Sequence, residues 1–121
     1  MRAYLPLTID EVRDFFLQKT FAPAIIYAPT IKFITANPEL DEEEAEYEIS
    51  MIAARESGGF VLAVELAEKE VSQHNEETIE ILNQIMWENV EALFVYDPVE
   101  DELTWYATQE IGDFLQSVGS K

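Results

Sequence analysis

The chain has 121 residues, of which 25 are Asp or Glu and 7 are Lys or Arg, so its formal net charge is −18. A surface this negative repels phosphate groups, and we therefore expect neither nucleic acid nor an anionic membrane as a ligand. The absence of cysteine excludes disulfides, thiolate metal ligands and cysteine nucleophiles.

The composition predicts a folded chain, because 48% of the residues are hydrophobic and 12% are aromatic. The length suits a single domain that spans residues 1–121. The first residues lack the long apolar core of a signal peptide, and no later segment is apolar enough to span a membrane. We therefore expect a cytoplasmic protein.

The first third of the chain alternates apolar runs with helix-start signals. Thr8 and Glu11 form a capping-box pattern ahead of an amphipathic segment. Pro29 suits the first turn of a short helix, where its missing N–H costs nothing. The elements predicted here are a strand at about 2–6, a helix at 9–19, a strand at 24–28 and a short helix at 30–35.

The clearest helical pattern begins at Asp41 and ends near Ser57, with acidic residues in the first turn that favour the positive end of the helix dipole. Its apolar residues form two stripes on nearly opposite sides. The first stripe is Ala45, Ile49, Ile52 and Ala53, and the second is Tyr47, Met51 and Ala54. Such a helix either lies inside the fold or presents one stripe to a partner.

The second half of the chain is richer in strand patterns. Residues 78–90 fit both a strand and a helix, and we favour a strand at 78–83 followed by a helical turn near Trp87. The other expected elements are a strand at 60–66, an edge strand at 70–72, a hairpin with strands at 92–96 and 103–107, and a helix capped by Thr108. This β-α-β-α-β-β-β-β-α order predicts an α+β fold, with a single mixed sheet of about five to six strands covered by three main helices.

Four stretches of the chain, residues 1–8, 41–47, 53–57 and 102–111, carry a resemblance to a known family. Together they resemble an uncharacterised family of small acidic actinobacterial proteins, and the string Trp-Tyr-Ala-Thr-Gln-Glu at 105–110 is its most specific part. The resemblance implies a strand near Ile79 and a bacterial cytoplasmic setting. It implies no activity.

The sequence contains no pattern typical of a metal site, a catalytic histidine or a phosphate-binding loop. The acidic run at 41–48 contains no EF-hand loop, and on a helix its side chains splay around the axis instead of converging on a cation. His74 is the only histidine, and its polar surroundings predict an exposed loop residue. No glycine-rich phosphate-binding pattern occurs. We therefore expect no metal, no cofactor and no catalytic residue.

The strongest candidate site is the strand-to-helix junction that begins at Trp105. Trp105 and Tyr106 should face opposite sides of the sheet, and Gln109 and Glu110 follow in the first helical turn. These groups could orient a ligand. In the alternative interpretation, Trp105 fills the core, Tyr106 packs at an edge and Glu110 complements the helix dipole.

Arginine is scarce in this acidic chain, so each guanidinium group should pair with a carboxylate. We expect Arg2 or Arg55 to pair with Glu46, Glu48 or Glu110.

The leading hypothesis from the sequence is a small protein-binding or regulatory module without catalytic activity, with a basic protein or a second copy of the chain as partner. An alternative is a small enzyme that uses Glu110 or Glu46 as a general acid–base. Another is an acidic mimic of nucleic acid. The residues predicted to contact a ligand or partner are Tyr47, Met51, Arg55, Tyr106, Gln109 and Glu110.

Overall fold

The computed structural model describes residues 1–23, 25–57 and 59–119 of the chain. In chain order the elements are β1 (Arg2–Leu7), α1 (Ile9–Gln18), β2 (Thr20–Phe21), α2 (Ile31–Ala36), α3 (Glu42–Ser57), β3 (Phe60–Glu65), β4 (Val71–His74), β5 (Ile79–Ile81), β6 (Ile85–Met86), β7 (Val90–Asp97), β8 (Glu102–Ala107) and α4 (Thr108–Gly119), with 3₁₀ turns at Glu68–Glu70 and Trp87–Asn89. The α+β class predicted from the sequence is confirmed.

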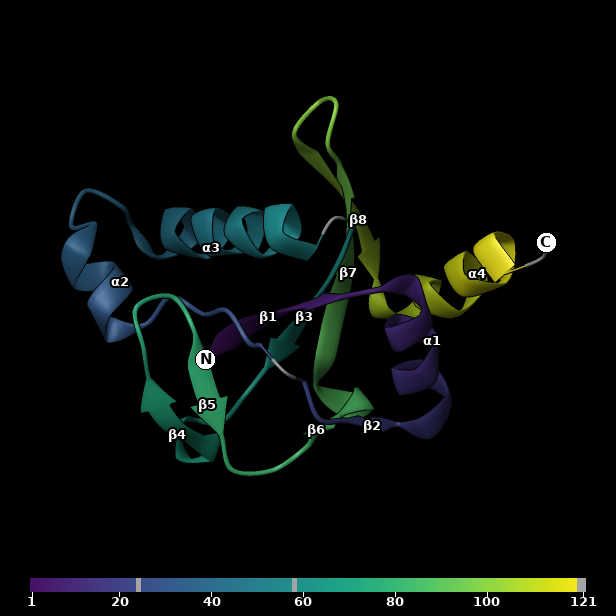
Figure 1. The fold of residues 1–121 in the computed structure, drawn as a ribbon, viewed down its shortest axis with the longest axis horizontal. Coiled ribbons are helices and arrows are strands. Elements are labelled where there is room, and N and C mark those ends of the chain that lie inside the picture. The colour runs from purple at the N-terminus through teal and green to yellow at the C-terminus, as the bar shows by residue number, and fades with distance from the viewer. Residues whose placement is uncertain (24, 58, 120–121) are drawn as a thin grey trace.

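Four of these strands form the main sheet, in the order β1-β3-β7-β8 with every neighbouring pair antiparallel. Helices α1 and α4 lie on one face of this sheet and α3 lies on the other (Figure 1). Because successive side chains of a strand point to opposite faces, Val61 packs toward α3 and Leu62 packs toward α1 and α4. The main sheet is therefore the middle layer of three.

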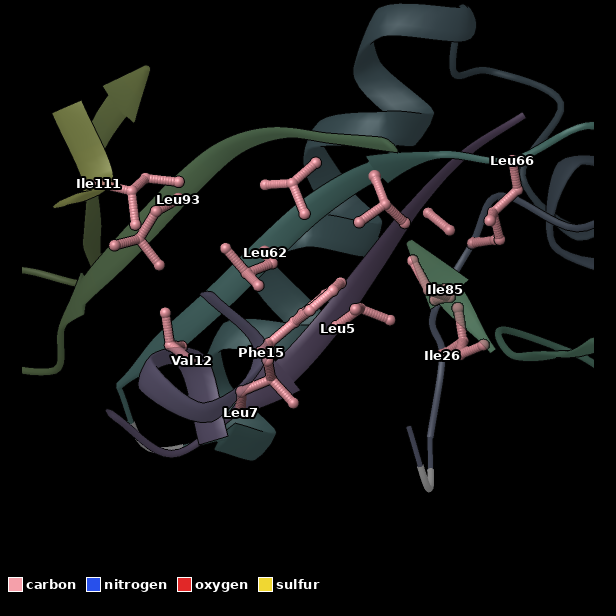
Figure 2. Packing of buried hydrophobic residues seen from close by; sticks show 14 of the residues in the cluster. Leu5, Leu7, Val12, Phe15, Ile26, Leu62, Leu66, Ile85, Leu93 and Ile111 are labelled. Carbon is pink, nitrogen blue, oxygen red and sulfur yellow. The ribbon is translucent and has the colours of Figure 1, made fainter. Parts of the chain in front are cut away.

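The larger of two core clusters begins between the main sheet and the helices α1 and α4 and extends past them to Ile26, Leu66 and Ile85 (Figure 2). Leu5, Leu62 and Leu93 lie side by side across three neighbouring strands. Phe15 of α1 and Ile111 of α4 cover them, and all five side chains are fully buried. Burial of aliphatic and aromatic side chains in this layer is the main source of stability for the fold.

Local hydrogen bonds fix the start of the two helices whose N-terminal signals are clearest in the sequence. At α1 the Glu11 N–H donates to Thr8 Oγ1 at 3.1 Å, and the Thr8 N–H donates to Glu11 Oε1 at 2.9 Å. Asp41 and Glu44 make the same reciprocal pair at the start of α3, with distances of 2.8 and 2.9 Å. The predicted capping box and both predicted helices are confirmed.

Most apolar side chains of helix α3 are buried. Ala45, Ile49 and Ala53 of its first apolar stripe are buried against the main sheet. Met51 and Ala54 of the second stripe are also buried, at 2% and 0% exposure. The second stripe therefore does not form a continuous surface for a partner.

The single mixed sheet of five to six strands is a wrong prediction. The remaining strands form two separate two-stranded sheets, β2–β6 and β4–β5. Residues 67–77 are mostly polar and offer no continuous apolar face that could extend the main sheet over a helix. The predicted strand near Ile79 and the helical turn at Trp87 are confirmed.

The strand expected at 24–28 also fails to form a ladder. Tyr27 makes isolated bridges to Tyr4 and Thr78, and Ala24 lies outside the described residues. Pro23 and Pro29 flank this segment, and because neither has an N–H to donate, continuous pairing stops at both ends.

Within the described ranges, no helix combines the length and the apolar character needed to cross a membrane.

Replacing a buried leucine with alanine tests the layered core. Leu62 is fully buried in the central strand β3, so Leu62→Ala should lower the free energy of unfolding by about 2–5 kcal/mol. Leu82→Ala makes the same chemical change at a side chain that is 63% exposed, and it should cost less than about 0.5 kcal/mol. Urea denaturation followed by circular dichroism measures both values. Equal losses in the two variants would contradict this packing.

Candidate functional site

A cavity of about 610 Å³ lies beside the start of β1, between α2, the first turns of α3 and the β4 strand. The N-terminus lies close to the β4–β5 pair, below α2 and α3 (Figure 1). One part of the wall is apolar and the other is charged or polar. The apolar residues are Pro29, Ile31, Ile34, Leu40 and Ala45, and the others are Met1, Arg2, Asn37, Asp41, Glu42, Glu46, Glu65, Glu68 and His74.

The segment before α2 holds the apolar wall in place. Tyr27 exchanges two main-chain hydrogen bonds with Tyr4, at 2.8 and 2.9 Å, which ties the segment to β1. The Thr30 hydroxyl donates to the Glu76 carbonyl at 2.5 Å and accepts from the Phe33 N–H at 3.1 Å, so it both anchors and caps α2. Helix α2 is thereby fixed between β1 and the loop before β5.

Two isoleucines of α2 line the cavity and remain open to solvent. Ile31 is 69% exposed and Ile34 is 51% exposed, whereas Phe33 of the same helix is buried. The helix therefore uses its buried side for packing and leaves an aliphatic surface at the cavity mouth. Exposed aliphatic groups beside a concave, charged wall are typical of a binding surface.

The charged wall is strongly acidic. Five carboxylates line it, whereas the cations are the Arg2 guanidinium and the Met1 amino group. The Met1 amino group donates to Glu65 Oε2 at 2.6 Å and to the Leu66 carbonyl at 2.7 Å. Arg2 Nη1 lies 3.3 Å from Glu91 Oε1. Because both cations already have partners, the remaining carboxylates leave the cavity negative.

Glu46 is the cavity carboxylate whose surroundings perturb it most clearly. Partial burial raises the pKa of Glu46, the nearby Arg2 charge opposes this rise, and Glu42 adds to it. Burial also raises the pKa of Tyr4 on β1, with the Glu46 charge as the next cause. A cation that entered the cavity would remove part of this penalty on the ionised form of Glu46.

Two nitrogen atoms of the cavity residues are buried without a hydrogen-bond partner, Arg2 Nε and His74 Nδ1. The prediction that His74 is an exposed loop residue is wrong, because His74 ends strand β4 and is partly buried. Its pairing with Ile79 of β5 turns it toward the cavity wall. Among the described residues, no group of His, Asp and Glu side chains is arranged to hold a metal ion.

The residues predicted to bind a ligand do not converge on one site. Tyr47 is 56% exposed on α3. Tyr106 lies on the opposite face of the main sheet, where its ring packs on the Phe114 ring of α4 with a centroid distance of 4.8 Å. Gln109 is exposed. Glu110 Oε1 accepts the Ala107 N–H at 2.8 Å and so caps α4. Capping of the helix start is therefore sufficient to explain the position of the Glu110 carboxylate, and no ligand is needed.

In the alternative interpretation of the same junction, the predicted positions of Trp105 and Tyr106 are wrong. The Trp105 side chain does not fill the core but is 59% exposed, and Tyr106 is the residue that packs inward. Trp105 lies opposite Phe94 of β7, on the face of the main sheet that α3 covers. The predicted separation of the two aromatic residues onto opposite faces is confirmed.

Both arginines named in the sequence analysis pair with carboxylates, but not with the predicted ones. Arg2 pairs with Glu91, and Arg55 makes two hydrogen bonds to Asp101, at 3.1 and 2.8 Å. The Tyr96 hydroxyl donates to the same Asp101 carboxylate at 2.5 Å. The last turn of α3 reaches the hairpin between β7 and β8, a contact between distant parts of the chain that no local pattern indicates.

Glu46 was predicted from the sequence as a candidate general acid–base and as a candidate partner of Arg2 or Arg55, but the cavity around it was not predicted. Glu65 ends β3 and Glu68 begins the following 3₁₀ turn, whereas Ile31 and Ile34 belong to a helix of only six residues. The one signal available in the sequence was the expectation that Arg2 has a carboxylate partner. The Arg2 charge does act on Glu46, although its ion pair is with Glu91.

A family model described as a family of unknown function, DUF6912, matches residues 1–99. The chain belongs to this family. All residues that line the cavity lie inside the matched range, whereas the junction at 105–110 lies beyond it. No curated protein and no solved structure matches the chain.

The raised pKa of Glu46 predicts a pH-dependent effect on stability. A carboxyl whose pKa is higher in the folded state loses stabilising free energy as the pH rises through that pKa. Glu46→Gln removes this loss, so the variant should gain stability over the natural protein at about pH 8 and gain less at about pH 3. Urea denaturation at both pH values measures the gain. Glu48→Gln, at an exposed position of the same helix whose charge does not contribute to the raised pKa of Glu46, is the control, and an equal gain there would contradict the assignment.

For the Arg55–Asp101 pair we predict the opposite dependence of stability on pH. Hydrogen bonds from Arg55, and then from Tyr96, lower the pKa of Asp101 from 3.8 to about 2. The stabilisation is therefore present above the ordinary pKa and is lost as the pH falls toward about 2. Carboxyl NMR titration should show the Asp101 midpoint rising in Arg55→Met. Arg13→Met removes an arginine that pairs with Asp10 and should leave the midpoint unchanged. An Asp101 midpoint that stays the same in Arg55→Met would contradict this prediction.

Proposed function

We propose that the protein is a binding module whose cavity receives a positively charged segment of a partner protein. The observation that carries this proposal is the composition of the cavity wall, where five carboxylates face exposed aliphatic side chains. This arrangement suits Lys and Arg, which combine an apolar stem with a charged head group.

The negative charge of the cavity wall is not balanced by cations. Glu42 and Glu46 lie one helical turn apart on α3, and Glu65 of β3 also contributes to the raised pKa of Glu46. Carboxylates that repel each other in a partly desolvated wall are stabilised when a cation lies among them. A guest cation therefore gains attraction and also relieves repulsion that already exists in the free protein.

The aliphatic part of the wall supplies contact area. Ile31 and Ile34 are exposed on α2, and Leu40 lies in the loop between α2 and α3. A charged guest alone would leave these side chains in water, whereas the methylene stem of Lys or Arg, or a neighbouring apolar residue of the partner, would cover them. The proposal therefore favours a basic peptide segment with apolar residues over a simple inorganic cation.

The net charge of −18 supports the same partner class at longer range. A field of one sign speeds the encounter with a positively charged partner, and salt weakens the effect by screening. The cavity then determines where on this negative surface the partner stays bound.

Peptide binding tests the proposal. A labelled peptide that contains Lys and Leu should bind, measured by fluorescence polarisation, and the same peptide with Glu in place of Lys should not. Glu42→Gln and Glu68→Gln should each weaken binding about two- to fivefold, the effect of one exposed charge pair. Raising the salt from about 50 to about 300 mM should weaken binding further.

Glu88→Gln is the matched control, because it removes one exposed carboxylate that does not line the cavity. This variant should bind the Lys-containing peptide as tightly as the natural protein does. If Glu88→Gln weakens binding as much as the cavity variants do, the peptide binds the general negative field and the proposed cavity role is wrong.

A further inference from the structure

Strand β8 forms one outer edge of the main sheet and has an unusually regular geometry for an edge. It pairs with β7 without interruption, from Asp97 opposite Glu102 to Ala92 opposite Ala107. Within the ranges that the structure describes, no other strand pairs with it. Because hydrogen-bonding positions alternate along an antiparallel strand, half of its main-chain N–H and C=O groups point away from β7.

Edge strands usually carry features that prevent another strand from pairing with them, such as Lys, Pro or a β-bulge. Strand β1, the other edge of the main sheet, has Pro6, and Tyr4 of that strand exchanges hydrogen bonds with Tyr27. Strand β8 has neither Pro nor Lys, and its pairing shows no shift in register. The two edges of one sheet therefore differ, and β8 is the unprotected one.

An exposed aromatic side chain lies on this unprotected strand. Trp105 is 59% exposed, on the face of the main sheet that α3 occupies. Helix α3 packs mainly on β1, β3 and β7, so it does not cover Trp105 on β8. The Ala107 N–H at the end of the strand already donates to Glu110 Oε1. A large apolar side chain beside main-chain groups that point away from β7 is nevertheless a combination suited to an added strand.

The charge around β8 indicates the chemistry of its partner. Residues 70–120 contain no Lys or Arg, so every charge that this part of the sequence contributes at neutral pH is negative. Glu102 begins the strand, Asp97 ends β7, Glu100 lies in the turn between them, and Glu110 follows. Arg55 of α3 reaches this turn, but Asp101 already binds it. A second copy of the chain would bring the same negative charges to the edge, whereas a basic segment would be attracted.

We propose that β8 accepts an extended basic segment of a partner protein as a fifth strand of the main sheet. Side chains of the added strand would alternate between the two faces. On the α3 face an apolar side chain or an Arg would cover Trp105, and on the other face a Lys would lie near Glu102. The proposal concerns a surface separate from the cavity and does not depend on it.

Amide hydrogen exchange with synthetic peptides tests the added strand. An eight-residue peptide of alternating Lys and Val should slow the exchange of alternate amides of β8, whereas alternating Glu and Val should not. Trp105→Lys should weaken binding about tenfold or more, because it removes the aromatic contact and places a like charge at the edge. Trp105→Thr retains a good strand former and should weaken binding without adding a charge.

Leu17→Lys is the matched control, since Leu17 is a 67% exposed apolar residue on α1, away from β8. It should leave peptide binding unchanged. Protection that appears outside β8, or equal binding of the acidic and basic peptides, would overturn the proposal. So would self-association of the free protein that Trp105→Lys abolishes, because the edge would then bind a second copy.

The cavity variant Glu42→Gln keeps this test separate from the proposed function. This variant should weaken binding of the Lys- and Leu-containing peptide to the cavity and leave the peptide-induced protection of the β8 amides unchanged. If β8 shows no protection while the cavity variants still weaken their peptide, the strand proposal alone is wrong. The reverse result would contradict the cavity proposal alone.

Discussion

Burial of both faces of strand β3 is the constraint on which the rest of the structure depends. Residues 61–64 are fully buried, with alternate side chains packed under α3 and under α1 and α4. A strand with no polar face needs a helical layer on each side and a paired strand at each edge. Strands β1 and β7 fill the two edges, and the covering helices then determine which surfaces remain open. The cavity and the exposed β8 edge both lie where this central layer ends.

Acidic residues have different roles in different parts of this fold. Glu11, Glu44 and Glu110 each accept a main-chain N–H at a helix start, so their charges serve local structure. Asp101 is bound by Arg55 and Tyr96. Glu46 is different, since partial burial makes its charge unfavourable. The total of −18 therefore combines carboxylates with a structural partner and carboxylates whose attraction for cations is still available.

Local patterns in the sequence predicted most helices and strands, because their causes lie within a few residues. The Thr8–Glu11 capping pair and the apolar spacing of Ala45, Ile49 and Ala53 are of this kind. The segment at 24–28 has the apolar run of a strand but is flanked by prolines, and its described residues, 25–28, make only isolated bridges. The cavity was not predictable, because Arg2, Glu65 and His74 come from distant parts of the chain. Whether a distant pair such as Arg55 and Asp101 meets depends on the arrangement of the layers.

Helix α3 physically connects the two open surfaces. Its first turn lines the cavity through Glu42, and its last turn is bound to the β7–β8 hairpin through Arg55 and Asp101. The helix has 16 residues and is about 24 Å long. A small rotation or shift of this rigid helix at one end must therefore move contacts at the other end. If occupation of the cavity changed the position of α3, the affinity of the β8 edge would change by a coupling free energy, and the same coupling would act in reverse.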